Sequence, residues 1–486
     1  IQGWMILILG WVFVTFYTRS MVYTMPEFLE RRYNPQSRTI LSVISLVSYV
    51  LTKVAVTVYA GGLVFQQVFG IKELWGIDFF WIAAIGLVVL TALYTIFGGM
   101  KSVLYTSVLQ TPILLLGSLI ILVLGFKELG GWDEMMRVCG AVTVNDYGDT
   151  MTNLIRSNDD ANFPWLGALI GSAIIGFWYW CTDQFIVQRV LSGKNEMEAR
   201  RGTIFGAYLK LLPVFLFLIP GMIAFALHQK YIGAGGEGFL PMLANGTANA
   251  DAAFPTLVAK LLPAGVKGLV VCGILAALMS SLASLFNSSA MLFTIDFYKR
   301  FKPETPEKKL VGIGQIATIV IVVLGILWIP IMRSVGDVLY TYLQDVQSVL
   351  APGIAAAFLL GICWKRTSAQ GGMWGLISGM VIGLTRLGAK VYYSNAGEVA
   401  DSTFKYLFYD MNWLFFCGWM FLFCIIVVIV VSLATEAPTA EKIQGLVFGT
   451  ATKEQKAATR ASWNHWDIIH TVIILAITAA FYWYFW

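Results

Sequence analysis

Residues 164–190 form one apolar segment that is interrupted by a run of aromatic and polar residues, Trp178-Tyr179-Trp180-Cys181-Thr182-Asp183-Gln184. Lipid does not tolerate a carboxylate and an amide at this depth, so these groups should face protein, water or a solute. The rings of Tyr179 and Trp180 suit stacking on the apolar C–H face of a sugar, although most membrane aromatics pack in the core. We therefore interpret the run as a candidate gate or binding platform, with core packing as the alternative.

A second set of polar residues follows one face of the predicted helix at residues 336–363. Gln344 lies one turn after Tyr340, and the stripe is extended by Thr341, Asp345 and Ser348. Amides donate and accept hydrogen bonds, as sugar hydroxyls do, so this face suits a neutral polyhydroxyl ligand. The alternative is a water-filled groove without a ligand.

Two lysines are predicted to lie too deep in the membrane to reach its surface. Lys210 occupies the middle of residues 202–228, where it should face a cavity or bond to backbone carbonyls. Lys53 occupies the middle of residues 38–68, one turn after Tyr49. Asp183 is a conceivable partner for Lys53, but by residue count it lies nearer the cytoplasm, so the sequence does not assign this pair.

Oxygen donors for a monovalent cation occur in the predicted helix at residues 266–298. Ala277, Ser280 and Ser281 stand on one helix face, at spacings i, i+3 and i+4. Hydroxyl and carbonyl oxygens without a carboxylate suit Na⁺ and would bind zinc or copper poorly. Small residues at this spacing also serve close helix packing, and the residues alone favour that alternative.

These candidate residues require a membrane-spanning scaffold. Of the 486 residues, 58% are hydrophobic and 13% charged, a balance that no soluble core could bury. We expect an all-α, multi-pass integral protein of the cell membrane, surrounded by lipid. The Lys and Arg residues of alternating loops place both ends of the chain outside, by the positive-inside rule. About twelve spans are predicted, at residues 1–19, 38–68, 77–98, 102–126, 164–189, 202–228, 266–298, 309–332, 336–363, 370–389, 411–435 and 466–486.

Several other classes of function lack a sequence signal. The net charge is +5 without a basic stripe, so we expect no nucleic-acid partner. The six cysteines contain no CxxC pair and the histidines are scattered, so neither a disulfide framework nor a zinc site is predicted. No nucleophile–base pair is apparent, so the chain is not expected to be an enzyme. The sequence leaves the oligomeric state open.

Several stretches together match one known family: Trp178-Tyr179-Trp180-Cys181-Thr182-Asp183-Gln184 with Ile186-Val187-Gln188-Arg189, Tyr23-Thr24-Met25-Pro26-Glu27-Phe28-Leu29, Gly98-Gly99-Met100-Lys101, Ser280-Ser281-Leu282-Ala283-Ser284 with Asn287-Ser288, and Trp364-Lys365-Arg366. They resemble the sodium/solute symporter family, most of all its sodium–glucose cotransporter branch and bacterial sodium–sugar symporters. The resemblance implies an inverted-repeat, leucine-transporter-like fold. It also implies a secondary active symporter that couples inward Na⁺ movement to uptake of a neutral, sugar-like solute by alternating access.

The same resemblance implies a division of the chain. Residues 1–127 would form a truncated first repeat with core helices 2–5, and residues 128–163 an external loop. Residues 164–366 would form the second repeat, helices 6–10, and residues 367–486 peripheral helices. The family usually has fourteen spans, so twelve spans and the abrupt start at Ile1 imply that the family's first two helices are missing.

Site residues also follow from the resemblance, position by position. The sodium site would comprise Ala277 through its carbonyl, Ser280 and Ser281. The sugar site would comprise Tyr179 as inner gate, Trp180 as stacking partner, Lys210 and Gln344 as hydrogen-bonding residues and, more weakly, Tyr49 and Tyr340.

The resemblance also implies that the missing first-repeat helix supplies the other sodium carbonyls and further sugar contacts, so the residues named here would form half a site. Four positions depart from the family pattern as well. Gly3 stands in place of a glutamate that binds sugar hydroxyls and Gly176 in place of an asparagine of a bacterial galactose symporter, so glucose or galactose is not specified. Ser107 and Ala283 stand in place of an aspartate and a hydroxyl residue of a second sodium site, which implies one Na⁺ per cycle. The alternatives are the same fold with another cargo, such as myo-inositol, sialic acid or an amino acid, or a solute sensor that does not transport.

Overall fold

The computed structural model describes residues 2–243, 246–335, 338–395 and 400–485, and these are almost entirely helical. Ten helical segments of the described chain are long and apolar enough to cross a membrane, and Phe79–Leu93 is a shorter apolar helix. A further helix of 27 residues, α17 (Ala369–Asn395), packs among the spans. The predicted all-α integral membrane protein is therefore confirmed, with ten clear spans and these two helices where about twelve spans are predicted.

The first part of the chain contains two spans with widened turns in their middle and a third, much longer helix. Its elements are α1 (Gln2–Ile8), η1 (Leu9–Phe13), α2 (Val14–Ser20), α3 (Met25–Arg32), α4 (Pro35–Ser48), η2 (Tyr49–Val54), α5 (Ala55–Phe69), the hairpin of β1 (Glu73–Leu74) and β2 (Ile77–Asp78), and α6 (Phe79–Leu129). The π-helical turns η1 and η2 widen their spans where polar residues such as Lys53 occur, and such turns are frequent at functional sites.

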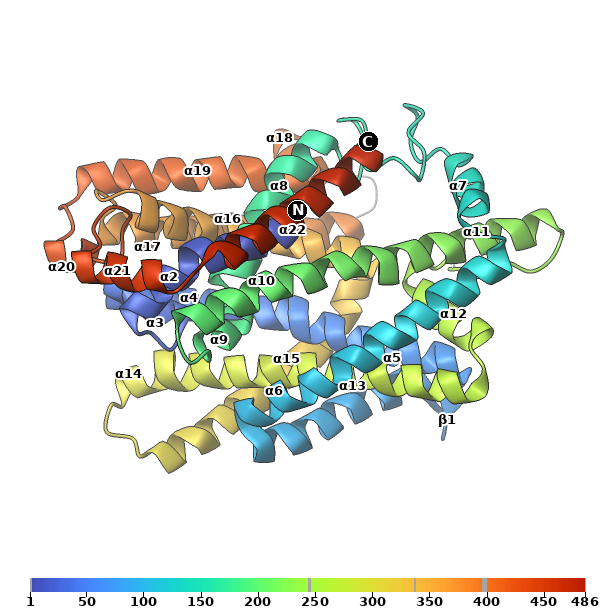
Figure 1. Ribbon diagram of the computed structural model, residues 1–486, viewed down its shortest axis with the longest axis horizontal. Helices are drawn as coiled ribbons and strands as arrows, with labels where there is room; N and C mark the ends of the chain where they lie inside the picture. Colours follow the sequence, from blue (N-terminus) through green and yellow to red (C-terminus); the bar gives the residue numbers. More distant parts are fainter. Residues whose placement is uncertain (1, 244–245, 336–337, 396–399, 486) are drawn as a thin grey trace.

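Helix α6 is a single run of 51 residues. Straight, it would be about 77 Å long, more than twice the hydrocarbon thickness of a membrane. Figure 1 shows it as two arms, light blue and cyan, that run in different directions. The predicted spans at residues 77–98 and 102–126 are these two arms, joined by a helical bend where we expected a break in the helix.

The second part of the chain again contains interrupted helices. Its elements are α7 (Trp132–Gly140), α8 (Trp165–Phe177), η3 (Trp178–Thr182), α9 (Gln184–Leu191), α10 (Glu196–Pro213), η4 (Val214–Leu218), α11 (Ile219–Gly233), η5 (Ala250–Ala252), α12 (Ala253–Leu261), α13 (Ala264–Met291), η6 (Leu292–Tyr298), α14 (Lys299–Phe301), α15 (Glu307–Val335) and α16 (Leu339–Cys363). The elements after α16 and α17 are α18 (Thr403–Lys405), η7 (Tyr406–Asp410), α19 (Trp413–Ala434), α20 (Ala440–Ile443), α21 (Lys453–Ala461) and α22 (His465–Tyr484).

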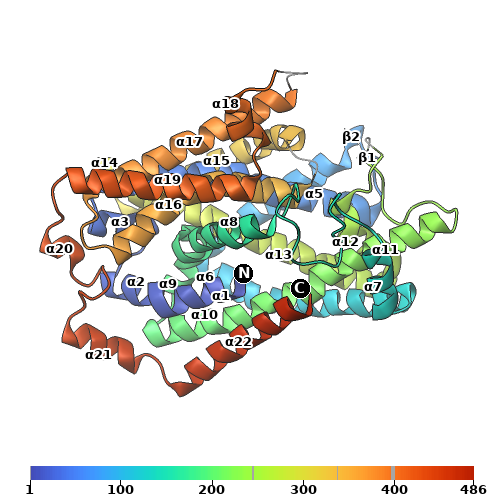
Figure 2. The ribbon, with the colours of Figure 1, turned by 90° about the horizontal axis from the view of Figure 1, so that it is seen from above.

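Loops of opposite charge lie at opposite ends of the molecule. Figures 1 and 2 place α3, α14, α20 and α21 at one end, and α7, α12 and the β-hairpin at the other. The first end contains basic loops predicted to be cytoplasmic, and the second contains the acidic segment 127–163 predicted to be external. This separation is what the positive-inside rule requires. The division of the chain into two repeats and peripheral helices stays a prediction.

Helix α16 forms the centre of the molecule, because almost all of its residues from Tyr342 onward are buried. It packs against α8, α17 and α19. At its crossing with α17 the backbones nearly touch: a Cβ on Gly379 would lie 2.6 Å from the Cα of Gly353. The glycines at this crossing therefore permit close helix packing.

Candidate functional site

The interrupted segment of residues 164–190 is a broken helix. Helix α8 widens into the π-helical turn η3 and ends at Asp183, whose backbone is extended (φ −81°, ψ 126°). The Asp183 carboxylate then caps α9, because its Oδ1 accepts a hydrogen bond of 3.1 Å from the Phe185 N–H. The polar groups that lipid would exclude therefore serve as the joint between two helices.

A buried cation neutralises the carboxylate at this joint. Lys53 of η2 forms an ion pair with Asp183, with side chains only 7% and 2% exposed. The Tyr49 hydroxyl donates a hydrogen bond of 3.0 Å to Asp183 Oδ1 and accepts one of 3.0 Å from the Phe185 N–H. Tyr49 thus lies beside the predicted site residues, where its hydroxyl bridges the two sides of the helix break. The sequence left the Lys53–Asp183 pair unassigned, because residue counting assumes regular helices, whereas Lys53 lies in the π-helical turn η2 and Asp183 follows the π-helical turn η3.

The two aromatic rings of the break lie between two lysines. Lys53 Nζ is 4.9 Å from the ring centroid of Tyr179, and Lys210 Nζ is 5.3 Å from that of Trp180. The rings of Tyr179 and Trp180 meet edge-to-face at 5.1 Å. The Trp180 indole N–H is buried and has no hydrogen-bond partner within the described chain. Three predicted site residues, Tyr179, Trp180 and Lys210, are therefore brought together, and one of them offers a free donor.

Helix α16 packs against η3 and presents the predicted amide. Gln344 is 9% exposed and its Nε2 donates a hydrogen bond of 2.9 Å to the hydroxyl of Tyr340. Tyr340 is 55% exposed and lines a cavity of about 770 Å³, together with Trp4, Arg156 and Trp165. Gln344 and Tyr340 are therefore hydrogen-bonded to each other, with Gln344 in the buried core and Tyr340 at the wall of the aromatic-lined cavity.

Asp345 does not share this face. It forms an ion pair with Lys390 and lies 3.9 Å from the Arg386 guanidinium, both on α17. The Ser348 hydroxyl is also occupied, because it donates a hydrogen bond of 2.6 Å to the Asp345 carbonyl. The predicted polar stripe of α16 is therefore divided between the Tyr340–Gln344 pair and a contact between α16 and α17.

The predicted sodium ligands lie on α13, which packs against η2, α5 and α9. Ser280 is buried, whereas Ala277 and Ser281 are half-buried. The Ser280 carbonyl accepts a hydrogen bond of 2.9 Å from the Ser284 hydroxyl. The side chain of Ser107 lies outside the described part of the structure. In the described chain no group of three or more His, Cys, Asp or Glu could hold a metal ion.

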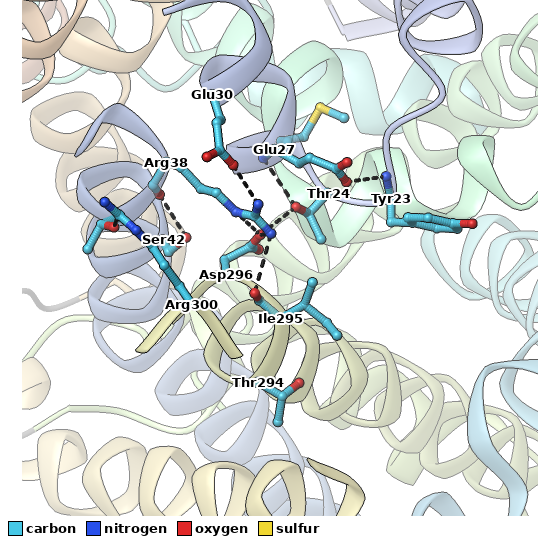
Figure 3. Close-up of polar contacts among 12 residues, drawn as sticks. Tyr23, Thr24, Glu27, Glu30, Arg38, Ser42, Thr294, Ile295, Asp296 and Arg300 are labelled. Atoms are coloured by element: carbon cyan, nitrogen blue, oxygen red, sulfur yellow. Dashed lines mark hydrogen bonds and ion pairs between the residues drawn. The ribbon is translucent and has the colours of Figure 1, made fainter. Parts of the chain in front are cut away.

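A network of charged and polar side chains ties the cytoplasmic end together (Figure 3). Arg38 of α4 donates to Asp296 of η6 at 2.7 Å and pairs with Glu30 of α3 at 2.6 Å. The Thr24 hydroxyl donates to the same Asp296 oxygen at 2.8 Å. Asp296 is not among the predicted site residues, although a carboxylate at the end of an apolar segment is a signal in the sequence. The structure shows that this carboxylate is fully buried.

The cytoplasmic network also reaches the broken helix. The Gln184 side chain, first residue of α9, accepts a hydrogen bond of 2.8 Å from the Met25 N–H of α3. Four elements, α3, α4, η6 and α9, are thus joined on the cytoplasmic side of the Lys53–Asp183 pair. This arrangement can hold the ends of these four elements together.

The fold has a counterpart among solved structures. A solved, substrate-bound, outward-open structure of a Na⁺-coupled sialic acid symporter is similar to it, with a TM-score of 0.68 at 20% identity over 90% of this chain and 84% of that one. The fold is thus the inverted-repeat, leucine-transporter-like fold of secondary active transporters, in which broken helices form the central site.

The chain belongs to the sodium:solute symporter family, whose model matches residues 1–379. It is 35% identical to a sodium/mannose cotransporter of Bos taurus over 99% of this chain and 83% of that protein. It is 37% identical to sodium/glucose cotransporter 1 of Ovis aries over 89% of this chain and 67% of that protein. The molecule is therefore a multi-pass membrane symporter with Na⁺ as its coupling ion.

Proposed function

We propose that the cargo of this symporter is a neutral sugar or sugar-like solute, taken up together with one Na⁺ per cycle. The single observation that supports this most directly is Trp180, whose ring lies against Lys210 and whose buried indole N–H has no partner in the described chain. A sugar offers an apolar C–H face to the ring and hydroxyl oxygens to the donor. The similar proteins named for mannose and glucose support the same class of cargo.

The charges of the site favour a neutral cargo. Lys53 is neutralised by Asp183, so it does not need an anion from the solute. Lys210 lies over the Trp180 ring and is half-buried, which leaves it able to donate to a hydroxyl. An amino acid remains the alternative, because Lys210 could pair with its carboxylate; myo-inositol and sialic acid are the other cargoes to test.

For the sodium ion we propose the carbonyl of Ala277 and the hydroxyls of Ser280 and Ser281. These oxygens share one face of α13 and include no carboxylate, as suits a monovalent hard cation. One such site with Ala283 beside it supports one Na⁺ per cycle. The roles proposed for the remaining residues are inner gate for Tyr179, hydrogen bonding to the cargo for Gln344, and weaker contacts for Tyr49 and Tyr340.

The energy available to this cycle is modest but sufficient. One Na⁺ moving through about 100 mV supplies roughly 2.3 kcal/mol, and a tenfold sodium gradient adds about 1.4 kcal/mol. Together they support accumulation of a neutral solute by about several hundredfold. Coupling requires that sodium favour the outward-open state that binds the cargo, which is a shift of populations.

Uptake by the purified protein in liposomes tests this proposal. Labelled mannose, glucose, galactose, myo-inositol, sialic acid and a neutral amino acid are supplied in NaCl and in choline chloride. We expect sodium-dependent uptake of a sugar or cyclitol and no chemical change of the cargo, as befits a transporter without an enzymatic step. Sodium-dependent uptake of the amino acid alone would overturn the proposed cargo, and binding without uptake would point to a sensor.

A further inference from the structure

A second connection runs from the broken helix to the sodium-binding face of α13. Arg189, near the end of α9, donates a hydrogen bond from its guanidinium to the Ser284 hydroxyl. The same hydroxyl donates at 2.9 Å to the carbonyl of Ser280, one turn earlier in α13. Ser284 is fully buried, so no water replaces either bond. One hydroxyl thus joins a cation on α9 to the backbone of a residue proposed to bind sodium.

Gln188 adds a parallel contact from the same helix. Its Nε2 donates a hydrogen bond of 3.3 Å to the Ser284 carbonyl, and the side chain is 6% exposed. The Arg189 side chain also lies over the Phe185 ring, 5.4 Å from the centroid. Phe185 is the residue whose N–H binds both Asp183 and Tyr49. The contacts to Ser284 therefore begin from a rigid part of α9, directly after the break.

We propose that Arg189 and Gln188 are positioning residues that hold Ser284, and through it the Ser280 backbone, in the arrangement that binds sodium. The proposal rests on the proposed function for the identity of the sodium ligands. A movement of the break at Trp178–Asp183, where the cargo is proposed to bind, is transmitted through α9 to the Ser280 carbonyl. Sodium and cargo then favour the same conformation because they act on one connected body.

Sodium binding to the purified protein tests this proposal independently of the cargo. The unfolding temperature is followed as NaCl replaces choline chloride at constant ionic strength, which gives the sodium concentration for half-maximal stabilisation. We expect Ser284→Ala to raise this concentration by about tenfold, because a hydrogen bond to a charged group is lost. Ser284→Thr keeps the hydroxyl and should restore a value within about twofold of the wild type. A purely structural role for Ser284 would lower the unfolding temperature in choline and leave the half-saturating sodium concentration unchanged.

A double-mutant cycle separates positioning from direct sodium binding by Ser284. Arg189→Gln alone should also raise the half-saturating concentration, and Arg189→Gln with Ser284→Ala should act no more strongly than the larger single change, because both interrupt one connection. Additive effects, or an unchanged concentration in either single variant, would overturn the proposal. Arg201→Gln, an arginine of α10 paired with Asp467, is the matched control and should have no effect.

If Ser284→Ala does not fold, Ser284→Cys takes its place, with an expected increase of about threefold since a thiol is a weaker donor. An unchanged value in that variant would overturn the proposal equally. If the wild type is stabilised by sodium yet transports no sugar, the proposed cargo fails while the sodium measurement still decides the role of Arg189.

Discussion

Lys53 and Asp183 lie 130 residues apart in the sequence and form a buried ion pair at the break between η3 and α9. The pair joins the widened turn η2 to the point where the helix of the aromatic run ends. Because both charges are withdrawn from water, each one is tolerated only while the other is present. The ion pair therefore connects η3, which is proposed to bind the cargo, to η2 of the neighbouring span.

The first prediction concerns this pair. Lys53→Met should lower the free energy of unfolding by about 3 kcal/mol, since an unpaired buried carboxylate remains. Asp183→Asn should act similarly while keeping the cap of α9, because Asn is as good a cap as Asp. The double variant should recover most of the loss. Unfolding in detergent measures all three; Asp401→Asn, from the exposed Lys405–Asp401 pair, is the control and should show no measurable change. Additive losses in the double variant would contradict the pairing.

The second prediction concerns Trp180. Trp180→Phe keeps a stacking ring but removes the free indole N–H, and we expect the half-saturating concentration of cargo to rise about threefold. Trp180→Ala removes both, with an expected rise of more than about tenfold. The measurement is initial uptake at saturating sodium. Trp374→Phe, on an exposed part of α17, serves as control. Equal values in all three variants would remove Trp180 from the cargo site.

The third prediction concerns the cytoplasmic network. Arg38→Gln breaks a charged contact to Asp296 and one to Glu30, so the cytoplasmic ends of α3 and η6 should open more often. Backbone amide exchange in these segments should accelerate by about tenfold or more, as expected for the loss of a hydrogen bond between charged groups. Lys308→Gln, an exposed charge in the first turn of α15, is the matched control. Exchange rates equal to those of the wild type would show that the network does not close this side.

The fourth prediction concerns pH and the external loop. The Asn145 amide and the Ser157 N–H each donate at 2.7 Å to Asp149 Oδ2 and hold the pKa of that carboxyl below its usual value. A lowered native pKa means that the contribution to stability is complete above the ordinary value of about 3.9 and is lost as the pH falls through the native value.

Proteolysis of the loop by pepsin should therefore change little between about pH 5 and 4 and accelerate below that range. Asp149→Asn should remove this step, whereas Asp146→Asn, at an exposed position, should retain it. A step of unchanged size in Asp149→Asn would assign the acid response to another group.

The sequence predicted those features that depend on residue type at one position. A carboxylate and an amide in an apolar segment were predicted to face something other than lipid, and the structure buries both against protein, Asp183 against Lys53 and Gln184 against the Met25 N–H. The spacing of Tyr340 and Gln344 placed them on one helix face, and the structure joins them by a hydrogen bond.

Features that depend on two distant elements could not be read in the same way. The helical spacing of Asp345 grouped it with Gln344, yet Lys390 and Arg386 of another helix determine what it contacts. The contact of Arg189 with Ser284 has no local pattern at all, since it joins residues 95 apart. The partners of Asp296 also come from distant elements, because Thr24 caps α3 and Arg38 lies on α4.

Accumulation of cargo at zero membrane potential tests the central claim most directly. The protein is reconstituted in liposomes with equal potassium on both sides and valinomycin, and a sodium gradient of about tenfold is imposed inward. Labelled mannose, glucose, galactose and myo-inositol are each followed to steady state. Symport with one Na⁺ predicts that the internal concentration of at least one of them rises to about ten times the external concentration, since the two gradients then balance. Equal concentrations on the two sides for all four would contradict sodium-coupled sugar uptake by this protein.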